Sequence, residues 1–206
     1  ISNMPRQIAL YEALGYALPQ FAHLPMILGP DKSKLSKRHG ATAVTEYQRQ
    51  GFLKSGFLNY LSLLGWSPQS EQELFSLDEL ITLFGFDRVN KAGAVFDIQK
   101  LTWMNGQYIR QLQGQALLDE VYSFIDSGSR AIFDQFTIDK QLMMVAAVRD
   151  NLQVLADINR YLEPFLASAE EAKAAILAVE FTESQLSVLQ AIFNQLQKGN
   201  GFKTKA

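Results

Sequence analysis

The sequence of 206 residues is 48% hydrophobic and 19% charged, a balance that is typical of a folded globular protein and argues against disorder. Its formal net charge of −2 means that any contact with nucleic acid must come from local basic patches, not from a generally basic surface. With no cysteine and two histidines, the sequence excludes disulfides, thiolate catalysis, cysteine-bound zinc and a histidine-rich metal site.

The two ends of the sequence suggest that it is a piece of a longer protein. The chain opens at Ile1 without an initiator methionine, and it closes on a polar tail at residues 198–206. No run of about 18 apolar residues and no signal-peptide pattern occurs, which predicts a cytoplasmic protein without a membrane segment.

The first 28 residues predict a helix followed by a short strand. Ser2 or Asn3 can cap a helix that carries Pro5 in its first turn, and Gly15 ends its apolar stripe. The apolar run at 25–28 stops at a Gly-Pro pair and suits a brief buried strand.

A basic segment follows at residues 29–40 and predicts an exposed, adaptable loop because glycines bracket it. It holds four cations within seven residues: Lys32, Lys34, Lys37 and Arg38. Lysine ammonium groups, serine hydroxyls and loop amides suit a polyphosphate, and they can stabilise charge that builds on a pyrophosphate leaving group. Such a cluster can equally be a solvated surface or a localisation signal, and composition alone leaves both open.

Helical patterns with glycine stops fill residues 42–113. We predict helices at 42–50, at 52–65, and at 77–84 behind the capping box Ser76-Leu77-Asp78-Glu79. A mixed loop at 86–97 precedes a helix that Asp97 can cap. We expect this helix to run over 98–104, to be interrupted at Asn105-Gly106, and to continue at 107–110.

Beyond Gly114 the composition changes to plain amphipathic helix, which predicts a domain boundary there and a weaker one near Ser168. The predicted helices lie at 115–125, 139–151, 154–165, 170–180 and 183–196, the last behind a capping box from Thr182 to Gln185. Little strand is expected, so the predicted fold class is mainly α.

The basic loop resembles the KMSKS loop of class I aminoacyl-tRNA synthetases. The stretch Lys34-Leu35-Ser36-Lys37-Arg38 has the form usual for glutamyl-tRNA synthetases, in which leucine replaces the methionine and arginine the last serine. Further stretches similar to that family lie at 3–7, 28–31, 34–42, 58–61, 63–66 and in parts of 96–109. The resemblance covers nearly the whole chain, clearly to about residue 112 and loosely after it.

This resemblance implies a ligase that joins glutamate to ATP, releases pyrophosphate and passes the glutamyl group to the terminal ribose of tRNA(Glu). It makes Lys37 the main catalytic contact to the ATP phosphates, with Lys34 assisting, and makes Ser36 and Arg38 the residues that shape the ATP-binding loop. Mg²⁺ is expected to arrive with ATP, and no protein-bound metal is predicted. Whether tRNA(Gln) is also charged stays open.

The resemblance also implies a domain order, in a protein expected to be a monomer. Residues 1–41 are expected to end a Rossmann-type catalytic domain, 42–113 to form a stem-contact domain, 114–168 an α-helical anticodon-binding domain, and 169–206 the start of a second one. The family's HIGH motif and glutamate pocket are expected upstream of Ile1, so the 206-residue chain alone is predicted to be inactive.

A second constellation comprises Lys91, Trp103, Asn105, Tyr108 and Arg110. The helical spacing of the two aromatic residues fits a protein core better than a nucleic-acid platform. By resemblance the region belongs to the stem-contact fold, so we expect Lys91 and Arg110 to contact tRNA phosphates and Trp103 to pack.

The two histidines receive weaker expectations. His39 could meet a phosphate beside the basic loop, whereas His23 is expected to be structural or exposed.

Other interpretations stay open. A glutamyl-queuosine tRNA synthetase shares the loop, but the helical region 115–196 speaks against it, and bacterial glutaminyl-tRNA synthetases carry β-barrel anticodon domains. A non-catalytic tRNA-binding module could have kept the helical part. A purely structural helical protein gives no reason for the loop.

Overall fold

The structure is a computed structural model, and it describes residues 2–40, 43–167, 182 and 187. The chain divides into two compact units, Ile1–Leu162 and Glu163–Ala206. The helices predicted at 170–180 and 183–196, with the capping box from Thr182 to Gln185, fall outside the described residues apart from single positions.

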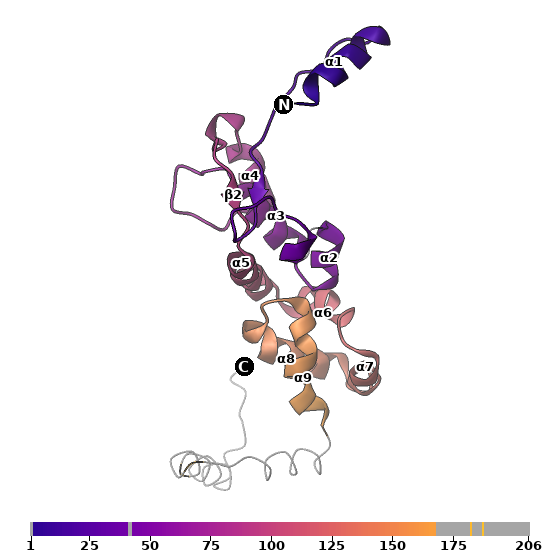
Figure 1. The fold of residues 1–206 in the computed structure, drawn as a ribbon. Helices are drawn as coiled ribbons and strands as arrows, with labels where there is room; N and C mark the ends of the chain where they lie inside the picture. Colours follow the sequence, from indigo (N-terminus) through magenta and orange to yellow (C-terminus); the bar gives the residue numbers. More distant parts are fainter. Residues whose placement is uncertain (1, 41–42, 168–181, 183–186, 188–206) are drawn as a thin grey trace. The chain divides into compact units, whose positions relative to one another are not determined.

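The described residues are mainly helical, as the sequence predicts, and they include one small parallel sheet (Figure 1). The elements in chain order are α1 Met4–Ala13, β1 Ile27–Leu28, α2 Val44–Arg49, α3 Lys54–Leu63, α4 Leu77–Leu83, β2 Ala94–Val95, α5 Ile98–Gln111, α6 Gly114–Tyr122, α7 Ser127–Phe133, α8 Ile138–Val148 and α9 Ile158–Leu166. Short 3₁₀ turns lie at Lys37–His39, Phe86–Arg88, Arg149–Asn151 and Leu155–Asp157. Within this part of the chain, no helix combines the length and the apolar character that a membrane crossing needs.

The sheet joins the segment before the basic loop to the segment before α5. Strand β1 pairs in parallel with β2, Ile27 opposite Ala94. The predicted strand is present, but the expectation that it is buried is wrong, because Ile27 is 37% exposed. Strand β2 lies in the stretch that the sequence assigns to a loop. Gly93 lets the strands meet, since a Cβ there would lie 2.9 Å from the Met26 carbonyl oxygen.

Helices α3 and α5 pack side by side within the first unit, Ile1–Leu162 (Figure 1). They approach closely because Gly56 faces Asn105, and a Cβ on Gly56 would lie 3.2 Å from the Asn105 Cα. Asn105 is buried, and its amide bonds to two other segments: Oδ1 accepts from the Leu53 N–H at 2.7 Å, and Nδ2 donates to the Gln153 carbonyl at 2.6 Å.

The predicted interruption of α5 is therefore wrong. The helix runs without a break through Asn105 and Gly106 to Gln111. Asparagine disfavours helices when its side chain competes for its own backbone. Here that side chain is engaged by partners far away in the sequence, so the local signal fails.

Helices α6 and α8 pack against each other and bury Leu117, Val121 and Val145. Between them in the sequence lies α7, a helix that the sequence analysis did not predict. Its start is signalled by Asp126, whose carboxylate accepts from the Ser129 N–H at 3.0 Å and from the Ser129 hydroxyl at 2.8 Å. This Asp-x-x-Ser pattern is a helix N-cap of the usual kind.

Two predicted caps are confirmed. At the start of α4 the Glu79 N–H donates to the Ser76 hydroxyl at 3.2 Å, and the Ser76 N–H donates to the Glu79 carboxylate at 2.7 Å. At the start of α5 the Asp97 carboxylate accepts from the N–H of Gln99 at 2.8 Å and of Lys100 at 3.1 Å. Both helices therefore begin where the sequence places them.

Candidate functional site

The basic loop at residues 29–40 is exposed, but it is held by its own backbone. The Gly29 N–H donates to the Ser33 carbonyl at 2.8 Å, and the Leu35 N–H donates to the Ile27 carbonyl at 3.0 Å. Lys32 adopts a φ of 60°, the left-handed conformation that lets so tight a turn close. The loop therefore projects from β1 in a defined conformation, where the sequence suggests an adaptable one.

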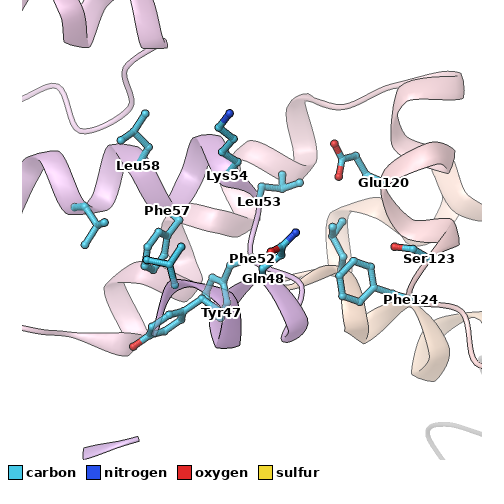
Figure 2. Close-up of a pocket in the computed structure, with 13 residues that line it drawn as sticks. Tyr47, Gln48, Phe52, Leu53, Lys54, Phe57, Leu58, Glu120, Ser123 and Phe124 are labelled. Carbon is cyan, nitrogen blue, oxygen red and sulfur yellow. The ribbon is translucent and has the colours of Figure 1, made fainter. Parts of the chain in front are cut away.

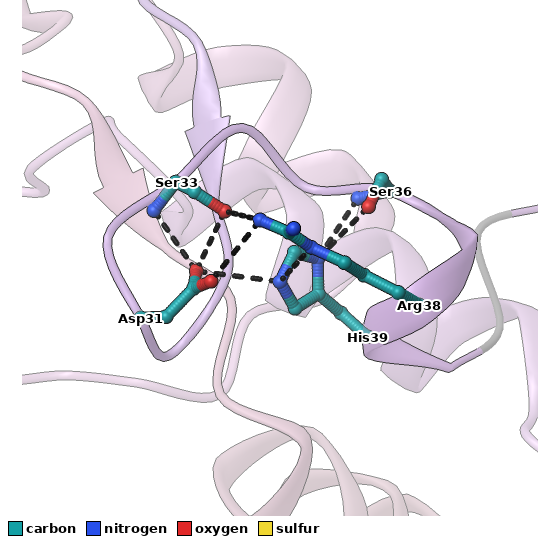
Figure 3. Close-up of polar contacts among 5 residues, drawn as sticks. All are labelled: Asp31, Ser33, Ser36, Arg38 and His39. Carbon is teal, nitrogen blue, oxygen red and sulfur yellow. Dashed lines mark hydrogen bonds and ion pairs between the residues drawn. The ribbon is translucent and has the colours of Figure 1, made fainter.

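A side-chain network ties the two arms of the loop together (Figure 3). The Asp31 carboxylate accepts from the Ser33 N–H at 2.9 Å and from the Ser33 hydroxyl at 2.7 Å. The Arg38 guanidinium donates to the other oxygen of Asp31 at 3.2 Å and to the Ser33 hydroxyl oxygen at 2.6 Å. Arg38 thus links the two arms of the loop through a carboxylate that the sequence analysis did not single out.

The network keeps Asp31 ionised. Hydrogen bonds from Ser33, first from its hydroxyl and then from its N–H, lower the pKa of Asp31 from 3.8 to about 2, with help from His39. A carboxyl whose pKa is lowered by folding stabilises the folded form above its unfolded pKa. That contribution is lost as the pH falls through the folded pKa.

We therefore expect the loop network to stay intact down to about pH 3 and to open as the pH falls through about 2, the folded pKa of Asp31. The amide resonance of Ser33, followed by NMR through an acid titration, should move with a midpoint near the pKa of Asp31. Asp31→Asn is the control, because its neutral side chain cannot titrate. A Ser33 transition that persists in that variant would contradict the assignment.

His39 stabilises the loop through contacts at both of its ring nitrogens. Its side chain is only 10% exposed, its Nε2 lies 3.3 Å from the Asp31 carboxylate, and its Nδ1 accepts from the Ser36 N–H at 3.1 Å. The ring packs on Gly29, where a Cβ would lie 2.9 Å from the imidazole. Both nitrogens face partners within the loop, so the geometry does not support the expected phosphate contact. His23 is exposed, one of the two outcomes that the sequence allows.

The side chains of Lys34 and Lys37 are accessible to a ligand from outside the loop. Both are exposed, and neither ammonium group has a hydrogen-bond or ion-pair partner within the described residues. Ser36 lies between them in an extended conformation and begins the 3₁₀ turn Lys37–His39. The loop thus separates its cations: Arg38 is neutralised by Asp31, whereas the two lysines of the motif remain available to an anion.

The second predicted constellation is not one surface. Lys91 is exposed in the loop before β2, beside a hollow of about 460 Å³ that Asp97 and Lys100 also line. Arg110 sits in the last turn of α5, and its guanidinium donates to the Asp150 carbonyl at 3.2 Å. The twelve residue steps from the start of α5 to Arg110 span about 18 Å, so Arg110 lies far along the helix from the hollow near its start that Lys91 lines.

The aromatic residues of this constellation divide differently from the expectation. Tyr108 is buried, and its hydroxyl donates to the Phe75 carbonyl at 2.7 Å, as a core residue should. Trp103 is 43% exposed, so the prediction that it packs in the core is wrong. The spacing places both side chains on one helix, but only the partners of α5 decide which face is covered.

An apolar hollow of about 610 Å³ lies between the α2–α3 segment and α6 (Figure 2). Tyr47 and Phe57 lie on one side of it and Phe124 on the other, while Lys54 and Glu120 add charges of opposite sign. The sequence analysis assigns no site to these residues. Their spacing is that of ordinary helix-packing positions, which carries no signal for a cavity.

The sequence profile of the family described as tRNA synthetases class I (E and Q), catalytic domain, matches residues 1–103, which is half of the chain. The chain belongs to this family. The basic loop, the parallel sheet and the start of α5 all lie inside the matched region.

Curated proteins that are similar to this chain carry the name glutamate–tRNA ligase. The chain is 48% identical over 160 residues to a glutamate–tRNA ligase of Desulforudis audaxviator, covering 77% of this chain and 32% of the relative. It is 42% identical over 207 residues to the glutamate–tRNA ligase of Heliobacterium modesticaldum, covering 97% and 41%. The chain therefore spans well under half of the length of these relatives.

A solved structure is also similar to the chain. The crystal structure of a glutamate tRNA ligase from Elizabethkingia meningosepticum, in complex with its amino acid, matches the chain with a TM-score of 0.67 at 28% sequence identity. The match covers 97% of this chain and 43% of that one.

Proposed function

We propose that this synthetase chain is part of a glutamate–tRNA ligase, which forms glutamyl-adenylate from glutamate and ATP and then esterifies tRNA(Glu). The observation that carries the proposal is the pair Lys34 and Lys37, which stands exposed on a braced loop in the positions of the KMSKS-type motif. Relatives of this name, matched over nearly all of the chain, support the specificity.

In this mechanism the glutamate carboxylate attacks the α-phosphorus of ATP, and the bond to the β-phosphate breaks. The electron pair leaves with pyrophosphate, whose growing negative charge Lys37 stabilises as the main contact while Lys34 assists. Ser36 and the Asp31-bound Arg38 keep the loop in shape. Mg²⁺ enters with ATP, and the described residues contain no group of three or more His, Asp or Glu side chains arranged to hold a metal.

The proposal also assigns the segments. Residues 1–41 close a Rossmann-type catalytic domain, 42–113 contact the tRNA stem, 114–168 read the anticodon arm, and 169–206 begin a second anticodon-binding domain. The protein works as a cytoplasmic monomer. Its substrates are ATP, L-glutamate and tRNA(Glu), with tRNA(Gln) as the second tRNA to be tested.

The direct test is aminoacylation by the full-length protein, with separate tRNA(Glu) and tRNA(Gln) and with pyrophosphate exchange measured alongside. Glutamate esterified to the terminal ribose of tRNA(Glu) is the expected result. Glutamate activation without that ester would favour a glutamyl-queuosine tRNA synthetase. Binding of tRNA without any activation would favour the non-catalytic module.

Lys91 and Arg110 are proposed to contact tRNA phosphates, and we expect Lys91 to contribute more because Arg110 is already engaged by the Asp150 carbonyl. Lys91→Ala should reduce the slope of log Kobs against log salt concentration by about 1. Lys91→Arg keeps the charge and should keep the slope. Equal slopes for all three proteins, measured by fluorescence anisotropy with labelled tRNA, would remove Lys91 from the interface.

A further inference from the structure

The network of Asp31, Ser33, Ser36, Arg38 and His39 connects parts of the loop that flank its two available lysines (Figure 3). We propose that Asp31 and His39 are positioning residues, which hold Lys34 and Lys37 in the geometry required for ATP activation. The inference rests on the proposed ligase function. It assigns a role to two side chains that do not themselves offer a group to the substrate.

Asp31 holds the two arms of the loop together through its bonds to Ser33 and Arg38, an arrangement that we call the clasp. One of its oxygens takes two hydrogen bonds from Ser33, which precedes Lys34, and the other takes the guanidinium of Arg38, which follows Lys37. Both lysines of the motif therefore lie within the segment that the clasp encloses. Opening it would let the two ammonium groups move relative to each other.

His39 fixes the same segment at its middle. The Ser36 N–H donates to Nδ1 at 3.1 Å, which ties the ring to the backbone between the two lysines. Nε2, on the other side of the ring, lies 3.3 Å from the Asp31 carboxylate and 3.3 Å from the Arg38 Nε. The imidazole thus links the backbone of Ser36, which separates the two lysines in sequence, to the carboxylate that closes the loop.

Charge gives a second reason for the clasp. Arg38 is 66% exposed along its side chain, so without Asp31 its charge would be left unneutralised beside the Ser33 hydroxyl, where it would repel Lys37 or compete with it for a phosphate. The lowered pKa of Asp31 keeps the carboxylate charged throughout the neutral range. The clasp therefore keeps Arg38 paired while leaving the motif lysines to the substrate.

The test is a double-mutant cycle in the full-length protein between Asp31→Asn and Lys37→Ala. Asp31→Asn keeps the size of the side chain but removes the charge that holds Arg38. We expect it to lower the kcat of glutamate-dependent pyrophosphate exchange by about 10- to 100-fold, because misplacing a catalytic group costs up to that much. In the Lys37→Ala background the same change should cost less than about tenfold, since only the part of its effect that passes through Lys34 remains.

Two further variants separate positioning from general damage. Ser76→Ala removes the cap of α4 and should leave exchange unchanged in both backgrounds, because Ser76 bonds only within the start of that helix. His39→Asn keeps an acceptor for the Ser36 N–H, so it should retain more activity than His39→Ala. Additive effects of Asp31→Asn and Lys37→Ala, or equal losses for the two His39 variants, would overturn the proposal.

A readout that needs no activity distinguishes this inference from the ligase assignment. Trypsin can cut after Lys34, Lys37 and Arg38, and an opened loop should be cut faster. We expect Asp31→Asn to raise the cleavage rate at these sites about fivefold or more over wild type, as followed by mass spectrometry. If wild type lacks pyrophosphate exchange, the ligase proposal fails and cleavage alone decides: faster cutting supports the clasp, and unchanged cutting refutes it.

Discussion

Replacing Lys37 by alanine in the full-length protein should slow glutamyl-adenylate formation by about 10²- to 10³-fold, the usual cost of removing one group that stabilises transition-state charge. Lys37 has no partner within the described residues, so its removal breaks no internal bond and leaves the braced loop in place. The loss should therefore appear in the chemical step, while tRNA binding changes little.

Pyrophosphate exchange with tRNA present measures the effect, and tRNA affinity is measured in parallel. Lys32→Ala is the matched control: it removes an exposed lysine from the same loop but from outside the motif, and its effect should stay within about twofold. Normal exchange by Lys37→Ala would contradict the assigned role. An equal loss in both variants would mean that the net charge of the loop matters and not the motif position.

Local signals predicted the parts of the fold that depend on neighbours in the sequence. The helix starts at Ser76 and Asp97 are correct because each cap bonds to backbone two or three residues away. The motif lysines lie exposed on their loop, as an exposed loop requires, and their role toward ATP stays a prediction. At the two caps the sequence pattern contains the whole interaction.

The failures occur where partners are distant. The Asp31–Arg38 pair spans seven residues and depends on the turn at Lys32, so composition shows only a basic loop with one acid in it. Trp103 follows the helical pattern of α5, but the neighbours of that helix leave it exposed. Neither result follows from periodicity, because periodicity does not say which face is covered.

Asn105 shows the same limit and yields the second large effect. We expect Asn105→Ala to destabilise the fold by about 2–5 kcal/mol. It leaves the Leu53 N–H and the Gln153 carbonyl without their partner, at about 1–3 kcal/mol each when buried. Urea unfolding of the 206-residue chain, followed by tryptophan fluorescence, measures the loss. Ser62→Ala, which removes an exposed hydroxyl bond on α3, should stay within about 0.5 kcal/mol.

Whether Asn105→Ala raises or lowers the stability distinguishes a continuous α5 from one that is interrupted at Asn105-Gly106. If Asn105 and Gly106 interrupted the helix, alanine at position 105 would be a better helix former and would stabilise it by about 0.6 kcal/mol. In the continuous helix Asn105 instead joins α5 to Leu53 and Gln153, which lie 52 and 48 residues away in the sequence. Faster hydrogen exchange of the Leu53 amide in Asn105→Ala, with α5 amides still protected, would place the loss at that junction and not in the helix.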